Sequence, residues 1–456
     1  MKSFPGLFLL FFIFQSSAQT LTLQQIRKIV LKENIDAVIA GNNLAISYNN
    51  YLSSLRVFYL PEISISASSP LVYQGTFPLT NQKRRTNHNL LGTLLIEEKL
   101  PWNMVISAEI NDRFVTYPPT NRTNQYSGKI TVKQPVLKNN GSDLRLARDS
   151  AEKKYKLDIL KLAAGEKELI YQAETLYYDL LSIESEIALA VRRIEKSTVN
   201  RNETEKKYQA GLITEITFLR IEQDYQKNLV NELDLLRRQK EKKEALANLL
   251  NIRAAENINI EKTIQYEPVI FDYETSLSKT LLNDQSLADL EYKLWQEKRD
   301  IHNQLENYRF NADLFMIFEK KYTSDYEIRA GIDVFTPVFK RGNMPRLLEN
   351  HRLTVNTLSM QLSNKKQTIA QNLERRIKNL SDLEKSIVLA RRNNEIAAKT
   401  YEIDNQRFEI GLITAETLIK TQEDYFETES RLLAKKIEYL KERSYLENKY
   451  WMAKSE

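Results

Sequence analysis

The residue types that most often perform catalysis or bind metals show no working arrangement in this chain. Two acidic pairs, Glu97-Glu98 and Glu222/Asp224, have the right groups for general acid-base chemistry, but carboxylates in a chain with 28% charged residues are mostly solvated. The nucleophile elbow, the phosphate-binding loop and the dinucleotide-binding glycine pattern are all missing from the sequence. The three histidines are scattered without the short spacing of a metal site: His88, His302 and His351. We therefore expect no enzyme activity and no cofactor or metal.

The charge balance and the cysteine count narrow the class further. The 456 residues include 66 basic and 60 acidic ones, a net charge of +6, and no block of basic residues stands out. A nucleic-acid partner is therefore not expected. The chain has no cysteine, so disulfides and a lipid-modified cysteine are both excluded.

The first 19 residues have the pattern of a secretory signal peptide. Lys2 supplies a positive charge, residues 7–14 form a short apolar run, and Ser16, Ser17 and Ala18 offer small side chains at a cleavage site. The apolar run is shorter than the ~20 residues of a membrane-spanning helix, and no later stretch approaches that length. These features predict export of the chain.

One sequence segment occurs twice. KKYQAGLITEITFLRIEQDY begins at Lys206, and NQRFEIGLITAETLIKTQEDY begins at Asn405. The glycines of the two copies, Gly211 and Gly411, are 411 − 211 = 200 residues apart, a period too long for a solenoid and typical of a duplicated domain. Each glycine lies between two long helical patterns, so we expect it to form the turn of a helical hairpin.

Heptad patterns flank both glycines. Residues at 4-3-4-3-4 spacing precede the first glycine, and a similar series precedes the second, as in a coiled coil: Leu169, Ala173, Leu176, Leu180, Ile183 and Ile187; Leu373, Ile377, Leu380 and Ile387. At 1.5 Å per residue, a helix of about 65 residues, as expected before each glycine, extends about 100 Å. An opening helix is expected near residues 21–59 in the first half and near 276–307 in the second.

Strand patterns follow each opening helix. Apolar and polar residues alternate with period two, for example at Tyr326, Ile328, Ala330, Ile332 and Val334. This pattern is typical of a strand with one apolar and one polar face. It fits a transmembrane barrel strand, and it also fits a soluble sheet with one buried face. Some of the 23 tyrosines could form an interfacial belt on such strands, or fill seams between helices.

Each strand region closes with a proline followed by a glycine. Pro135 precedes Gly141 and Pro337 precedes Gly342, and the prolines are 337 − 135 = 202 residues apart. These residues are expected to form the strand-to-helix turns. The first half holds about 50 extra residues upstream of Pro135, which we interpret as an additional hairpin over roughly 71–116 with its turn near Pro101. Residues 20–262 and 263–456 thus form two expected structural repeats.

With these motifs, the chain resembles the TolC-like outer membrane factors, also called the outer membrane efflux protein family. The resemblance covers essentially the whole mature chain. Its most specific part is an aromatic residue three positions before Gly-Leu at each helical tip, combined with duplication at about 200 residues. The residues that carry it are Tyr208, Gly211, Leu212, Phe408, Gly411 and Leu412.

The resemblance implies a mostly α fold with a transmembrane β part. Three copies would share one twelve-stranded barrel in the outer membrane, with four strands from each chain. Duplicated long helical hairpins would form an α-helical tube in the periplasm. The chain would be a passive exit duct of a tripartite efflux or type I secretion system. Its tips would dock a periplasmic adaptor (membrane fusion) protein, and an inner-membrane transporter would supply the energy.

The resemblance also implies a candidate periplasmic constriction. Some members of the family carry acidic residues six and nine positions after the second tip glycine, where they form a cation-selective ring. Here those positions hold Thr417 and Lys420, and the first copy holds Thr217 and Arg220. We therefore expect weaker cation selectivity than in a relative with an acidic ring.

A different class of protein explains part of the pattern. An exported soluble coiled-coil scaffold or adaptor would account for the signal peptide and the heptads. It would leave unexplained the two sets of alternating strands that end in Pro–Gly at matched positions. Cargo, partner proteins and the placement of the extra hairpin are not encoded in any motif.

Overall fold

The structure is a computed structural model. It describes residues 20–69, 71–74, 85–117, 121–137, 142–253, 255, 258–262, 266–306, 310–322, 325–336, 343–410 and 412–450. The predicted signal peptide, residues 1–19, lies outside the described residues, as do Gly141, Pro337, Gly342 and Gly411.

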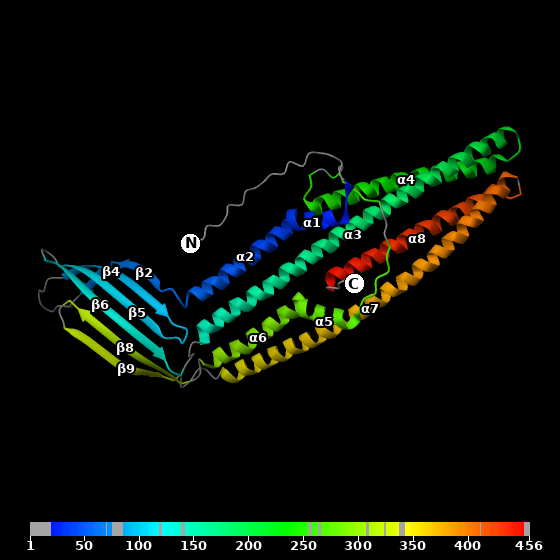
Figure 1. Ribbon diagram of the computed structural model, residues 1–456. Helices are drawn as coiled ribbons and strands as arrows, with labels where there is room; N and C mark the ends of the chain where they lie inside the picture. The colour runs from blue at the N-terminus through cyan, green and yellow to red at the C-terminus, as the bar shows by residue number, and fades with distance from the viewer. Residues whose placement is uncertain are drawn as a thin grey trace. The chain divides into compact units, whose positions relative to one another are not determined.

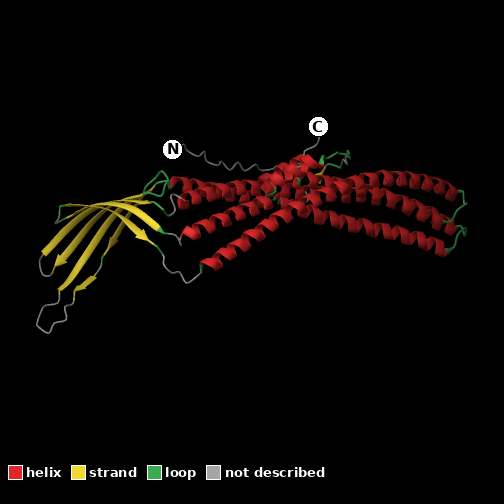
Figure 2. Cartoon of the chain, turned by 90° about the horizontal axis from the view of Figure 1, so that it is seen from below, coloured by secondary structure: helices red, strands yellow, loops and turns green. Residues whose placement is uncertain are grey.

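Most of the described chain is helical (Figure 2), and the helices repeat in the same order in the two halves (Figure 1). Each half has a pair of helices of 11 and 22 residues, then a very long helix, and then a helix of about half that length. The helices are α1 Leu23–Glu33, α2 Ile35–Arg56, α3 Ser142–Gln209, α4 Glu215–Leu250, α5 Tyr273–Asn283, α6 Gln285–Glu306, α7 Met344–Glu409 and α8 Ala415–Lys449.

Each expected opening helix is in fact two helices. Asn34 ends α1 with an extended backbone (φ −70°, ψ 133°), and its Oδ1 accepts hydrogen bonds from the backbone N–H groups of Asp36 (2.8 Å) and Ala37 (3.2 Å) at the start of α2. Asp284 separates α5 from α6 with a similar backbone conformation. A side-chain acceptor that caps the next helix explains the break, because it satisfies N–H groups that would otherwise lack partners.

The chain divides into two compact units. The first comprises residues 1–41, 161–284 and 366–456. Its core includes the expected heptad residues Ala173, Leu180, Leu373 and Ile387, each fully buried. Burying one such leucine or isoleucine contributes about 1.5–3 kcal/mol. Two short parallel strands, β1 Thr20–Leu21 and β7 Asn259–Ile260, also belong to this unit.

The second unit comprises residues 42–160 and 285–365 and contains a large antiparallel sheet. Its strand order is β2-β4-β5-β6-β8-β9, and β3 pairs with β4 beyond the end of β2. The strands lie side by side in Figure 1. Their bounds are β2 Glu62–Ser68, β3 Leu71–Gln74, β4 Arg85–Lys99, β5 Val105–Tyr117, β6 Asn121–Pro135, β8 Asn311–Lys321 and β9 Tyr326–Phe335.

The extra hairpin of the first half is β4–β5, and it belongs to this same sheet. Its turn lies at residues 100–104, as expected: the backbone N–H of Leu100 donates to the Met104 carbonyl (2.8 Å), and Asn103 adopts φ 66°. Trp102 and Met104 lie in this turn, before β5 begins. The four strands implied by the resemblance are therefore present as β2, β6, β8 and β9, and two further strands separate β2 from β6.

Candidate functional site

One face of the sheet is apolar across six of its strands, from β2 to β9. Residues that lie opposite one another in the register form a continuous row: Ile63, Ile96, Ala108, Ile130, Phe318 and Ile328. Ile63 is 64% exposed and Ile328 is 62% exposed, so nothing within the described chain covers the two ends of this row. An apolar surface of this extent marks a contact with another apolar phase or a partner.

The opposite face is polar and charged. The neighbouring row of the register contains five polar residues out of six: Ser64, Leu95, Glu109, Lys129, Glu319 and Glu327. Ion pairs link strands on this face, with Arg329 2.7 Å from Glu319 and Lys133 2.8 Å from Asp313. A sheet that is apolar on one face and charged on the other is the pattern of a transmembrane barrel wall around water.

Exposed aromatic side chains gather at both ends of the sheet. At the end where β8 turns into β9 lie Tyr322 (61% exposed) and Tyr326, whose ring stacks on Phe318 at 5.4 Å. Trp102 and Phe335 lie at the other end, at the β4–β5 turn and at the end of β9. Aromatic belts at both ends of an apolar band are typical of the two interfaces of a membrane.

Among the residues that the structure describes, no helix has the length and apolar character needed to cross a membrane. Within the same ranges, no group of three or more histidine, aspartate or glutamate side chains is placed to hold a metal ion.

Gly211 forms the tip between α3 and α4 with a left-handed backbone, φ +72°. The N–H of Leu212 donates to the Lys207 carbonyl (2.8 Å), and the N–H of Gly211 donates to the Tyr208 carbonyl (2.9 Å). These two bonds define a Schellman motif, in which the residue with positive φ is usually glycine. The prediction of a glycine turn at this position is confirmed.

The second tip, between α7 and α8, has the same geometry as the first in its described residues. The N–H of Leu412 donates to the Arg407 carbonyl (2.8 Å). Thr214 and Thr414 begin α4 and α8 as N-caps with the same backbone conformation, and each Oγ1 accepts a bond from the N–H three residues on, at Thr217 (3.4 Å) and Thr417 (3.3 Å). The duplicated sequence therefore specifies the same local geometry twice.

The two hairpins pack together near their tips. Ile221, Phe408 and Leu418 form a buried apolar cluster contributed by α4, α7 and α8. Lys207 places its Nζ 4.6 Å from the centre of the Phe408 ring, and the Tyr208 ring stacks on Phe218 at 5.4 Å. The tip aromatics Tyr208 and Phe408 thus fix the ends of the long helices against their neighbours.

The leucines of the Gly-Leu pairs have no such role. Leu212 is 74% exposed and Leu412 is 71% exposed, and Ile216 and Ile410 beside them are also exposed. Each tip therefore presents apolar side chains to solvent beside a hydrogen-bonded turn, an arrangement suited to contact with another protein.

The candidate constriction residues are divided by the structure into three environments. Thr217 and Thr417 lie in the first turns of α4 and α8, where their hydroxyls contact those of the capping threonines at 3.0 Å. Arg220 is held by an ion pair with Glu416 (2.6 Å). Lys420 is exposed and forms no salt bridge with any residue in the described ranges. No hydrogen bond or salt bridge within the described ranges joins these four residues to one another.

Two carboxylates that the sequence analysis did not single out organise the helices of the first unit. Glu174 on α3 is fully buried and accepts bonds from Arg27 and from Ser444 and Asn448 on α8. The sequence gives little indication of either carboxylate, because each resembles the many solvated acids of α3 until the fold places its partners beside it.

Asp179 is the second of these carboxylates. It binds Lys242 on α4 (2.6 Å) and Lys441 on α8. Burial opposes the ionisation of Asp179, but the hydrogen bonds from Lys242 and Lys441 outweigh it and hold the pKa of this carboxyl below its usual range.

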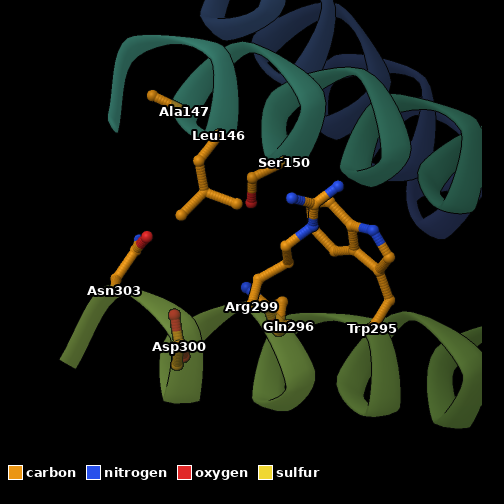
Figure 3. Close-up of a pocket in the computed structure, with 8 residues that line it drawn as sticks. All are labelled: Leu146, Ala147, Ser150, Trp295, Gln296, Arg299, Asp300 and Asn303. Atoms are coloured by element: carbon orange, nitrogen blue, oxygen red, sulfur yellow. The ribbon is translucent and has the colours of Figure 1, made fainter. Parts of the chain in front are cut away.

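A cavity of about 260 Å³ lies between α3 and α6 in the second unit (Figure 3). Figure 3 shows Trp295, Arg299 and Asn303 of α6 pointing toward α3 around it. None of the candidate site residues lines it; its walls are Leu146, Ala147, Ser150, Trp295, Gln296, Arg299, Asp300 and Asn303. Their mixture of aliphatic, amide and charged groups shows no catalytic arrangement.

Comparison with known proteins gives a consistent result. Residues 110–251 match the model of the family described as outer membrane efflux protein. No curated protein matches the chain in sequence.

Solved outer membrane channels share the fold. The chain is similar to the CmeC channel of Campylobacter jejuni, with a TM-score of 0.72 and 12% identity over 94% of this chain and 85% of that one. It is similar to VceC of Vibrio cholerae, with a TM-score of 0.70 and 11% identity over 94% and 96% of the two chains. It is similar to the open MtrE channel of Neisseria gonorrhoeae, with a TM-score of 0.65 and 15% identity over 94% of this chain and 88% of that one.

The family match over residues 110–251 and the channel fold over 94% of the chain together confirm the resemblance to the TolC-like outer membrane factors, the outer membrane efflux protein family.

Proposed function

We propose that this protein is a passive exit duct in the outer membrane, working in a tripartite efflux or type I secretion system. The observation that carries the proposal is the sheet with one apolar face and one charged face, edged by exposed aromatic residues. In a barrel wall, the apolar face meets lipid and the charged face lines a water-filled passage. The fold shared with outer membrane channels supports the same function.

We further propose that the duct is a homotrimer. Support comes from an exposed apolar series at seven-residue spacing: Leu389, Ile396 and Ile403 on α7 and Ile410 just past its end, each at least 50% exposed. An apolar heptad series without a partner in its own chain is the seam of a coiled coil with another chain. The sheet also indicates assembly with other copies, because its outer edges are unpaired within the described chain and open edges are not tolerated in lipid.

The helical tips are the proposed docking points for a periplasmic adaptor, with an inner-membrane transporter as the source of energy. Support comes from the exposed Leu212 and Leu412 on turns whose backbone is fixed by hydrogen bonds. Leu212→Asp combined with Leu412→Asp should abolish transport while leaving the assembled protein in the membrane. Leu282→Asp, at an equally exposed leucine of α5, is the matched control and should transport normally. Normal transport by the tip variant would remove this role.

The duct itself is tested by extraction and conductance. Protein in the membrane fraction should resist carbonate, change mobility in SDS on heating, and form ion-conducting pores in planar bilayers. Release by carbonate without pore formation would instead favour the exported soluble coiled-coil scaffold. In the same bilayers, reversal potentials in a KCl gradient should show weaker cation selectivity than those of a relative with an acidic ring.

A further inference from the structure

The sheet ends in two strand edges that have no partner among the described residues. One edge is β2, continued along β4 by β3, and the other is β9. Each free edge leaves backbone N–H and C=O groups without hydrogen bonds, and every such group costs several kcal/mol in hydrocarbon. If this sheet lies in a membrane, as the proposed function requires, both edges must find strands in other copies of the chain.

The β4–β5 hairpin is part of the wall of the sheet. It separates β2 from β6, with Ile63 paired to Ile96 on one side and Ala108 paired to Ile130 on the other. Ile96, Ala108 and Ile110 of the hairpin continue the apolar face, and Glu109 continues the charged face, on which Leu95 also lies. A hairpin folded over the mouth of the barrel would have left β2 beside β6 and would not share both faces of the sheet.

We propose that three copies close one barrel of eighteen strands, six from each, with β9 of one copy pairing with β2 of the next. This inference rests on the proposed membrane function and trimer. All neighbouring strands along the sheet are antiparallel, so β2 and β9, at positions one and six, run in opposite directions. The new pair is therefore antiparallel as well, and the barrel closes with an even number of strands.

The side-chain alternation restricts how these edges join. Ile63 and Ile65 on β2 belong to the apolar face, as do Ile328 and Ile332 on β9. Odd-numbered residues of β2 must therefore lie opposite even-numbered residues of β9, because a shift by one residue would turn apolar side chains into the lumen.

Eighteen strands imply a wider lumen than the twelve implied by the family resemblance. Barrel diameter grows roughly linearly with strand number, so the barrel is about 1.5 times wider and its cross-section about 2.3 times larger. Barrels of ~16–18 strands leave an open aqueous channel. The outer-membrane end of this duct therefore admits bulkier cargo than a twelve-stranded one.

Cysteine cross-linking tests the join in a chain that has no cysteine of its own. Ser64→Cys would be combined in turn with Glu327→Cys, Arg329→Cys and Asp333→Cys, all on the charged face, and oxidised in the outer membrane. At least one pair should give covalent dimers and trimers on non-reducing gels. Ser64→Cys with Ala330→Cys, on opposite faces, should give none. Equal cross-linking by this control, or none by any pair, would contradict the join.

A second pair tests the hairpin within one chain. Ser107 on β5 lies opposite Thr131 on β6, so Ser107→Cys with Thr131→Cys should form an intrachain disulfide in the assembled protein. Electron cryo-microscopy of the detergent-extracted complex should then show three chains and eighteen strands. A trimer with twelve strands, or a dimer with twelve, would overturn the inference and leave the membrane duct standing. A soluble monomer would overturn the proposed function itself.

Discussion

Gly211→Ala tests whether the tip glycine is required for its backbone conformation alone. A Cβ added at Gly211 would meet no atom within 4 Å, so the substitution introduces no clash. The only penalty is the left-handed backbone at φ +72°, which disfavours every residue with a side chain. Gly211→Ala therefore measures the cost of the left-handed backbone conformation alone.

The size of this term follows from the backbone alone. A left-handed conformation costs an L-residue about 1–2 kcal/mol, so local opening of the tip should become about 5- to 30-fold more frequent. Asparagine tolerates this conformation better than alanine, so Gly211→Asn should have a smaller effect.

The chain supplies a matched control in Gly165, which lies within α3 and also has no atom within 4 Å of an added Cβ. Gly165→Ala should stabilise its helix by about 0.5–1 kcal/mol, since alanine is the better helix former. One substitution type thus has opposite predicted signs at two positions of the same unit.

Hydrogen exchange measured by mass spectrometry on the intact protein is the assay. Peptides covering residues 206–214 include the amides of Gly211 and Leu212, which are bonded to the Tyr208 and Lys207 carbonyls. After correction for intrinsic rates, exchange at the tip should accelerate in Gly211→Ala and stay unchanged in Gly165→Ala. Unchanged tip exchange in Gly211→Ala would refute the reasoning.

Three further outcomes are expected. Glu174→Ala should lower the free energy of unfolding by about 3 kcal/mol, because it leaves Arg27 without its buried partner. The control Lys156→Ala, in an exposed pair, should change that free energy by less than about 0.5 kcal/mol. Chemical denaturation measures both values. Burial, with the nearby Glu423 charge, raises the pKa of Asp224, so the ionised form of Asp224 disfavours folding. Asp224→Asn should therefore slow hydrogen exchange at the tip at pH 7. This difference in exchange between the variant and the wild type should vanish as the pH falls below about 4, where wild-type Asp224 is protonated. Lys420→Asp should shift the reversal potential in a KCl gradient toward cation selectivity, and an unchanged potential would show that Lys420 lies away from the ion path.

Features encoded by local sequence could be predicted. The glycine turn and the heptad seams depend on residues within a few turns of one another, and Gly211, Leu180 and Leu373 take the expected places. The β4–β5 turn also followed from Pro101 and its flanking alternation.

Features that depend on distant partners could not be predicted. The position of the β4–β5 hairpin between β2 and β6 is set by pairing across the sheet, which alternation alone does not specify. Glu174 is distinguished from other acids of α3 only by its contacts with Arg27 and Ser444, at sequence distances of 147 and 270 residues. The helix break at Asn34 was missed because an asparagine within an apolar periodic pattern gives a weak signal.

The most direct test of the duct is native mass spectrometry on protein extracted with detergent from the outer-membrane fraction. We predict a complex of three chains. A monomer or dimer recovered from the soluble periplasm would contradict it.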